Sequence, residues 1–107
     1  MSDIHTIRLK QPWQCESLAD GSRWSRCFNW PAGVLPQETV WLVVEPLPEG
    51  ATVQLNGRAL VDPLDRPLAR FDISALIADR NQVVIQLAGP SEEDQFPLRV
   101  RLEIDEG

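Results

Sequence analysis

The sequence predicts an all-β protein: an antiparallel β-sandwich of about eight strands in one domain that spans residues 1–107. Apolar residues recur at every second position in several short runs, which is the period of a half-buried strand. Nine prolines and six glycines are scattered along the chain, so turns separate these runs. Asn56-Gly57 stands between two of the runs. Both central residues of a type I′ hairpin turn need positive φ, and this pair suits them.

The N-terminal third is predicted to contain two strands. Residues 5–10 alternate between apolar and polar, which indicates a first strand with Ile7 and Leu9 inward. A polar connection over residues 11–22 leads to a second strand at 23–30. The residues expected on one face of that second strand are Trp24, Arg26, Phe28 and Trp30.

Residues 39–45 are apolar on both alternating faces, which is typical of a central strand with both faces covered. The residues expected to face the core are Val40, Leu42 and Val44. The outward set is then Thr39, Trp41 and Val43, and Val84 from another strand is expected to join it. An exposed apolar patch indicates a partner or a ligand, so we expect the 11–22 connection, a second copy of the chain or a ligand to cover it.

The C-terminal half continues the pattern. Strands are predicted at 52–55 and 58–61, on either side of the Asn56-Gly57 turn. Residues 62–67 form a loop, because proline cannot donate to a ladder. A short strand at 68–71 ends in Phe71 and leads into one helical turn that Asp72 or Ser74 can cap.

The last two strands show the clearest alternation. One starts at Asn81 and places Val83, Ile85 and Leu87 inward. An acidic loop over residues 89–97 separates it from the final strand at 98–104. The inward residues expected there are Leu98, Val100, Leu102 and Ile104.

Charge and targeting signals exclude several classes of partner. Sixteen acidic and ten basic residues give a net charge of −6, and no basic stripe is present, so nucleic acid and anionic membranes are not expected partners. No targeting segment is visible, which predicts a cytoplasmic protein. Cys15 and Cys27 are expected to be reduced and to act as small buried apolar residues.

No constellation of residues indicates catalysis, so the chain is predicted not to be an enzyme. His5 is the only histidine, and no residue is nominated to orient it as a general base. No motif for a cofactor is present. Asp62, Asp65 and the run 92–94 could supply oxygen ligands, but they lack the ligand number and spacing of a calcium loop. We therefore expect solvated acidic loops and no metal.

Four segments carry a resemblance to a known family. They are Arg23-Trp24-Ser25-Arg26-Cys27-Phe28-Asn29-Trp30-Pro31, Gln54-Leu55-Asn56-Gly57-Arg58, Phe71-Asp72-Ile73-Ser74 and Asn81-Gln82-Val83. Together they resemble the galactose-binding-like jelly roll, in particular the sugar-binding domain that precedes the catalytic domain in family 2 glycoside hydrolases. The resemblance implies a jelly-roll fold and a role associated with carbohydrate. The family's glycine- and aromatic-rich stretch is replaced here by residues 62–67. The chain holds no barrel with paired catalytic carboxylates.

Tryptophan is the main indication of function, because exposed indole faces stack on the C–H faces of sugars. Trp13 and Trp41 are the candidate platforms, and Asp62, Asp65 and Arg66 could bond the sugar hydroxyls. Three interpretations stay open: a non-catalytic carbohydrate-associated module, a protein-interaction or oligomerisation module that uses the outward face of strand 39–45, and an accessory subunit or remnant of a glycoside hydrolase. At this flat face a homodimer is favoured over a sugar.

Overall fold

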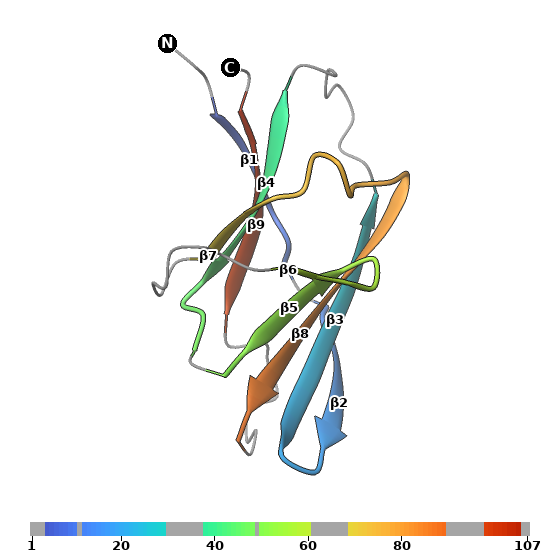
Figure 1. The fold of residues 1–107 in the computed structure, drawn as a ribbon, viewed down its shortest axis with the longest axis vertical. Helices are drawn as coiled ribbons and strands as arrows, with labels where there is room; N and C mark the ends of the chain where they lie inside the picture. The colour runs from blue at the N-terminus through green and yellow to red at the C-terminus, as the bar shows by residue number, and fades with distance from the viewer. Residues whose placement is uncertain are drawn as a thin grey trace.

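The computed structural model describes residues 4–10, 12–29, 38–48, 50–60, 69–89 and 98–105. Within them, nine strands form two antiparallel sheets that pack face to face (Figure 1). The four-stranded sheet has the order β1-β9-β4-β7, and the five-stranded sheet has the order β2-β3-β8-β5-β6. The prediction of an all-β antiparallel sandwich is confirmed. The strands are β1 (Ile4–Arg8), β2 (Gln14–Leu18), β3 (Gly21–Asn29), β4 (Thr39–Glu45), β5 (Thr52–Leu55), β6 (Arg58–Leu60), β7 (Ala69–Asp72), β8 (Arg80–Ala88) and β9 (Arg99–Asp105).

The strand pairing is nested along the chain once β2 is set aside. The first strand, β1, pairs with the last, β9, and β3 pairs with β8. Inside these, β4 pairs with β7, and β5 pairs with β6 in the central hairpin. Further pairs of β4 with β9 and of β5 with β8 join the nested pairs into the two sheets. The first and last strands therefore lie side by side at one edge of the four-stranded sheet, with Ile4 opposite Asp105.

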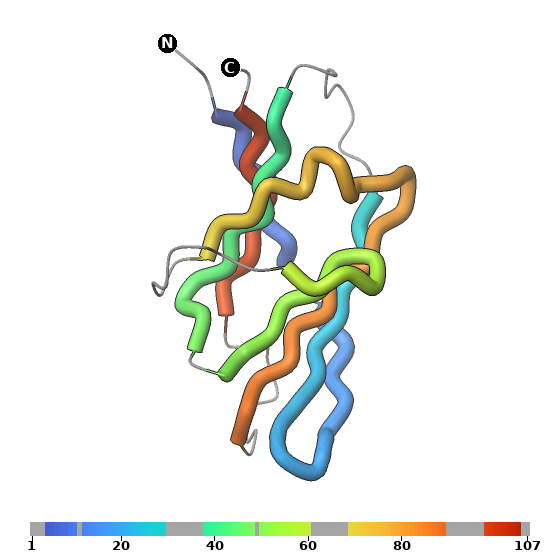
Figure 2. Tube along the Cα trace, viewed as in Figure 1, coloured from blue at the N-terminus to red at the C-terminus, as the bar shows by residue number. Residues whose placement is uncertain are grey.

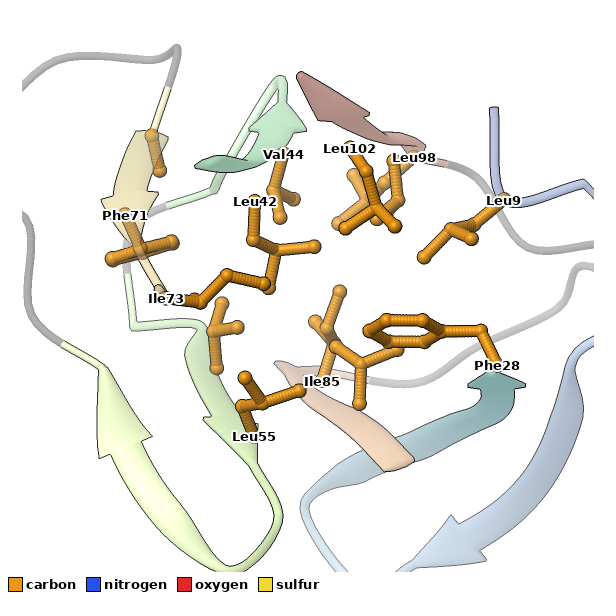
Figure 3. Packing of buried hydrophobic residues seen from close by; sticks show 14 of the residues in the cluster. Leu9, Phe28, Leu42, Val44, Leu55, Phe71, Ile73, Ile85, Leu98 and Leu102 are labelled. Carbon is orange, nitrogen blue, oxygen red and sulfur yellow. The ribbon is translucent and has the colours of Figure 1, made fainter. Parts of the chain in front are cut away.

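The core lies between the two sheets, as the alternating pattern predicts. Figure 3 shows Leu42 and Leu102 of the four-stranded sheet pointing toward Leu55 and Ile85 of the other. Trp24 is also buried, and its indole N–H donates to the Ser22 hydroxyl at 2.9 Å. The predicted inward residues of β4, Val40, Leu42 and Val44, are all buried.

Two asparagines tie the central hairpin to the rest of the fold. Asn56 and Gly57 both have positive φ, 52° and 82°, as the tight turn requires. The Asn56 side-chain oxygen accepts from the backbone N–H of Gln82 at 2.9 Å, and its amide donates to the Asn81 side chain at 3.0 Å. The same Asn81 oxygen accepts from the backbone N–H of Ala78 at 2.7 Å. Both side chains therefore serve the scaffold.

The segment between β7 and β8 crosses from one sheet to the other at the end of the sandwich (Figure 2). Phe71 anchors its start in the core. The Asp72 carboxylate then accepts from the backbone N–H of Ser74 at 3.0 Å, and the N–H of Ile77 donates to the carbonyl of Ile73 at 3.0 Å. A single turn capped by Asp72 is what the short polar side chain predicts at this position.

Some expectations need correction. The 11–22 connection contains β2, which pairs with β3; four of its five residues are exposed, so no inward alternation marks the strand. Cys15 and Cys27 are free but exposed, because Cys27 points away from the core on β3 and Cys15 lies on exposed β2. The predicted loop 62–67, the acidic loop from residue 90 on, and Trp30 lie outside the described residues.

Candidate functional site: a basic cleft where β1 ends and β9 begins

An open cleft of about 1210 Å³ lies in the four-stranded sheet where β1 ends and β9 begins. Its side chains come from β1 and β9, from the segment that follows β1, from Leu98 just before β9 and from Glu45 at the end of β4. Apolar residues and charged residues both contribute to its walls. The lining residues are Thr6, Arg8, Leu9, Lys10, Trp13, Glu45, Leu98, Arg99, Val100 and Arg101.

The apolar wall of the cleft is built where the chain leaves β1. The backbone N–H of Leu9 donates to the carbonyl of Val100 at 2.9 Å, which extends the pairing of β1 and β9 by one bond. The Leu9 carbonyl then accepts from the indole N–H of Trp13 at 3.1 Å. Leu9, Trp13 and Leu98 are buried, and Figure 3 shows Leu9 and Leu98 at the same end of the core.

The charged wall of the cleft is mostly basic. Among the described residues, four of the chain's ten basic residues line it, together with one carboxylate, that of Glu45. The register of the sheet brings them together: Arg8 is the partner of Arg101, and Arg99 is the partner of Glu45. A chain of net charge −6 therefore concentrates positive charge at one place.

Arg101 is the one lining cation with carboxylate partners among the described residues. It donates from Nε to Glu103 at 2.9 Å and from Nη1 to Glu45 at 2.7 Å. The hydrogen bond to Glu103 raises the pKa of Arg101, and Glu45 adds to this, against a smaller lowering from burial. The guanidinium is therefore charged and held in place by its two acids.

The other three lining cations are exposed and unpaired within the described part of the chain. The ion pairs there join Arg23 to Glu16, Arg70 to Glu103, and Arg101 to Glu45 and Glu103. None of these pairs includes Arg8, Lys10 or Arg99, and all three side chains are open to solvent. Arg8, Lys10 and Arg99 are thus three exposed cations whose N–H groups can donate hydrogen bonds to an external anion.

The outward face of β4 is covered by the chain's own side chains. Trp41 does face outward, half-buried, and the guanidinium of Arg70 lies 4.1 Å above its ring. Val43 beside it is fully buried, although it lies outside the core between the sheets. Its cross-strand neighbours are Arg70 and Arg101, which Glu103 bridges. Arginine stems cover apolar surface while their heads pair with carboxylates, so an open apolar patch does not form.

The expected contribution of Val84 to that patch is wrong. Val84 belongs to β8 of the five-stranded sheet, whereas Trp41 and Val43 lie on the four-stranded sheet. The outward faces of the two sheets point in opposite directions, so these residues cannot form one surface. Among the described residues, the only large apolar side chain that is mostly exposed is Ile4.

Of the predicted ligand-binding residues, the structure describes only the two tryptophans, and it places them apart. Trp13 lines the cleft but is 8% exposed, and Trp41 lies outside the cleft lining. Asp62, Asp65 and Arg66 lie outside the described residues. Sequence reasoning missed the free cations Arg8, Lys10 and Arg99. Their signal was present, because each is a polar position in an alternating run, but only the pairing of β1 with β9 brings the runs together.

A second hollow, of about 530 Å³, lies beside the central hairpin. Asn56 and Asn81 contribute to its lining. Their side chains are already bonded to each other and to the backbone, as described above. The hollow therefore offers fewer free polar groups to a ligand than the basic cleft does.

The described residues offer no metal site and no membrane-spanning helix. No group of three or more His, Cys, Asp or Glu residues is placed to hold a metal ion in the described ranges. None of the described segments forms a helix that is long and apolar enough to cross a membrane. The chain matches none of the models of known families and none of the curated proteins with which we compared it.

Proposed function

We propose that this chain is a non-catalytic carbohydrate-binding module with a galactose-binding-like jelly roll, and that the basic cleft is its ligand site. A jelly roll consists of eight strands in two sheets, joined as two Greek keys. The nested pairing of β1 with β9, β3 with β8, β4 with β7 and β5 with β6 supports this topology, with β2 as an added edge strand. The motifs shared with sugar-binding domains lie on these strands and turns.

The observation that carries the proposal is the mixed chemistry of the cleft. Sugar rings present apolar C–H faces and polar hydroxyls, so a sugar site needs an apolar wall beside hydrogen-bond donors. Leu9, Trp13 and Leu98 supply the apolar wall, each with less than a tenth of its surface exposed. Arg8 and Arg99 supply donors on the other side. A volume of about 1210 Å³ is large enough for a short oligosaccharide.

The non-catalytic part of the proposal rests on the carboxylates of the cleft. Most glycoside hydrolases use two carboxyl groups that flank the scissile bond. Among the described residues, Glu45 is the only acid that lines the cleft, and its carboxylate is bonded to Arg101. Within the described lining, no second carboxylate is present to act with it.

The test is a titration of isotope-labelled protein with a panel of oligosaccharides, followed by amide NMR. We expect shifts at the backbone amides of Arg8, Leu9 and Val100, and none at Thr52 and Gln54 on the other sheet. The sugar signals should stay unchanged over days, because nothing is hydrolysed. If no sugar shifts the cleft amides, or if the sugar is cleaved by repurified protein, the proposal is wrong.

A further inference from the structure

The cleft gathers like charges at a cost to the fold. Arg8 stands directly opposite Arg101 in the register of β1 and β9, and Arg99 lies two residues from Arg101 on the same face. Side chains opposite each other in an antiparallel pair are about 5 Å apart at Cβ, and like charges there are destabilising. Lys10 adds a further cation to the same lining. Among the described residues, Glu45 is the one acid in the lining, and Glu103 outside the lining also pairs with Arg101.

This excess is local, because four cations line one cleft of a chain whose net charge is negative. Solubility does not require it, because the net charge of −6 already provides repulsion between copies. Elsewhere on the surface, Arg23 pairs with Glu16, whereas Arg58 and Arg80 belong to none of the ion pairs of the described residues. At the cleft, Arg8 and Arg99 likewise form no ion pair within the described part of the chain, although Glu45 lies opposite Arg99 in the register. A bound anion would relieve the repulsion that the fold maintains there.

We propose that the ligand of the cleft is an acidic sugar, an oligosaccharide of uronic acids whose carboxylates are bound by Arg8, Lys10 and Arg99. The inference rests on the proposed function, since it names the class of sugar. A guanidinium presents a planar fork that binds a carboxylate through two hydrogen bonds, and an ammonium adds a point charge. Only the exposed edges of Leu9 and Trp13, which are 6% and 8% exposed, are open to the ring faces.

The contact of Glu45 with Arg101 is a carboxylate–guanidinium hydrogen bond within the cleft lining. A carboxylate oxygen already lies 2.7 Å from a guanidinium nitrogen at the edge of the lining. Glu45 is also the cross-strand partner of Arg99, so it opposes an incoming anion at two cations. Replacing Glu45 with Gln should therefore strengthen the binding of an acidic sugar.

Nucleic acid does not fit the same surface. Its affinity comes from many phosphate contacts along a basic stripe, and this protein offers one compact group of cations in an acidic chain. Screening limits the attraction of these cations to a distance of about 10 Å at moderate salt. A ligand with spaced carboxylates and apolar ring faces fits both walls of the cleft, whereas a phosphate backbone fits only one.

Calorimetry with two probes tests the proposal: a tetramer of galacturonic acid, and the same tetramer with its carboxyl groups methyl-esterified. The acid should bind at least about tenfold more tightly, which corresponds to ~1.4 kcal/mol. Arg99→Gln should weaken the binding of the acid by about tenfold or more, a loss of ~1.4 kcal/mol. Arg80→Gln, at an exposed position in the other sheet, is the matched control and should leave it unchanged. Glu45→Gln should strengthen it.

The outcomes separate the two proposals. Equal affinity for the acid and the ester overturns the acidic-sugar inference and leaves the carbohydrate module standing. Equal binding of hexaglutamate, lost in Arg99→Gln, overturns the sugar assignment and shows an acidic peptide as the ligand. If neither tetramer nor any neutral oligosaccharide binds, both proposals fail. Circular dichroism of each variant shows whether a loss of binding comes from unfolding.

Discussion

The guanidinium of Arg70 lies 4.1 Å above the indole ring of Trp41, on the outward face of the four-stranded sheet. A cation over an aromatic face contributes about 0.5–1 kcal/mol at exposed sites and more when it is desolvated. Arg70 also pairs with Glu103 at 3.5 Å, and Glu103 bonds to Arg101. The two arginines and their shared acid thus cover Val43, which is fully buried between them.

Removing the charge of Glu103, the acid that Arg70 and Arg101 share, should destabilise the packing of the two arginines over Val43. Glu103→Gln breaks ion pairs to both arginines, and the Glu103 side chain is only 16% exposed, so solvent cannot replace them fully. We expect a loss of about 1–3 kcal/mol in the free energy of unfolding, measured by urea denaturation. Glu16→Gln is the control, because the Glu16 side chain is 65% exposed. It should lose less than about 0.5 kcal/mol. Equal losses would show that the cover adds no stability.

The pattern of apolar residues predicted much of this sheet but not its cover. Alternation identified Val40, Leu42 and Val44 as inward, since only period and polarity were needed. It also showed that Trp41 and Val43 face outward. It could not show which residues cover them, because Arg70 and Arg101 come from strands whose pairing with β4 depends on topology. The same limit hid the cleft, which exists only where β1 meets β9.

The core prediction can be checked by truncation. Leu42 is 0% exposed and central in β4, so Leu42→Ala should lower the free energy of unfolding by about 2–5 kcal/mol. Val100→Ala should cost less, because fewer atoms are removed and Val100 is 5% exposed. Both losses should appear as a lower urea midpoint with an unchanged slope. A Leu42→Ala variant as stable as the parent would contradict the packing.

A larger residue at Gly57 in the hairpin turn should strain the backbone without a steric clash. Gly57 has a φ of +82°, and a Cβ there would meet nothing within 4 Å. Gly57→Val should therefore cost only the strain of a β-branched residue at positive φ, about 1–3 kcal/mol. Gly57→Asn is the control, because asparagine tolerates this region, and it should lose much less. Thermal melts of the two variants give the comparison, and coincident melts would show that the turn does not need positive φ.

The exposure of both cysteines gives a prediction about reactivity. Cys15 and Cys27 are free and exposed on the five-stranded sheet. A thiol reagent should therefore modify two thiols in the native protein without denaturant, since access is a main requirement for reaction. Cys27→Ser should reduce the count to one and leave the fold intact. Thiols that react only after denaturation would show that one or both side chains are shielded.

Substitutions of Trp41 test whether the outward face of β4 is covered by the chain's own arginines or forms a dimer interface. A glutamate at position 41 would stand opposite Glu103 on β9 and Asp72 on β7, so like charges would face it across both neighbouring strands. It would also remove the ring beneath Arg70 and expose Val43. We expect Trp41→Glu to lower the free energy of unfolding by about 2–4 kcal/mol, and Trp41→Phe, which keeps an aromatic ring, to lower it less.

The oligomeric state decides between the two interpretations of that face. Because Arg70 and Arg101 already cover Trp41 and Val43, we expect light scattering to give a monomer for the parent and for folded Trp41→Phe and Trp41→Glu alike. A parent dimer that Trp41→Glu converts into a folded monomer would instead place Trp41 in an interface between copies, since an unpaired buried charge there opposes association.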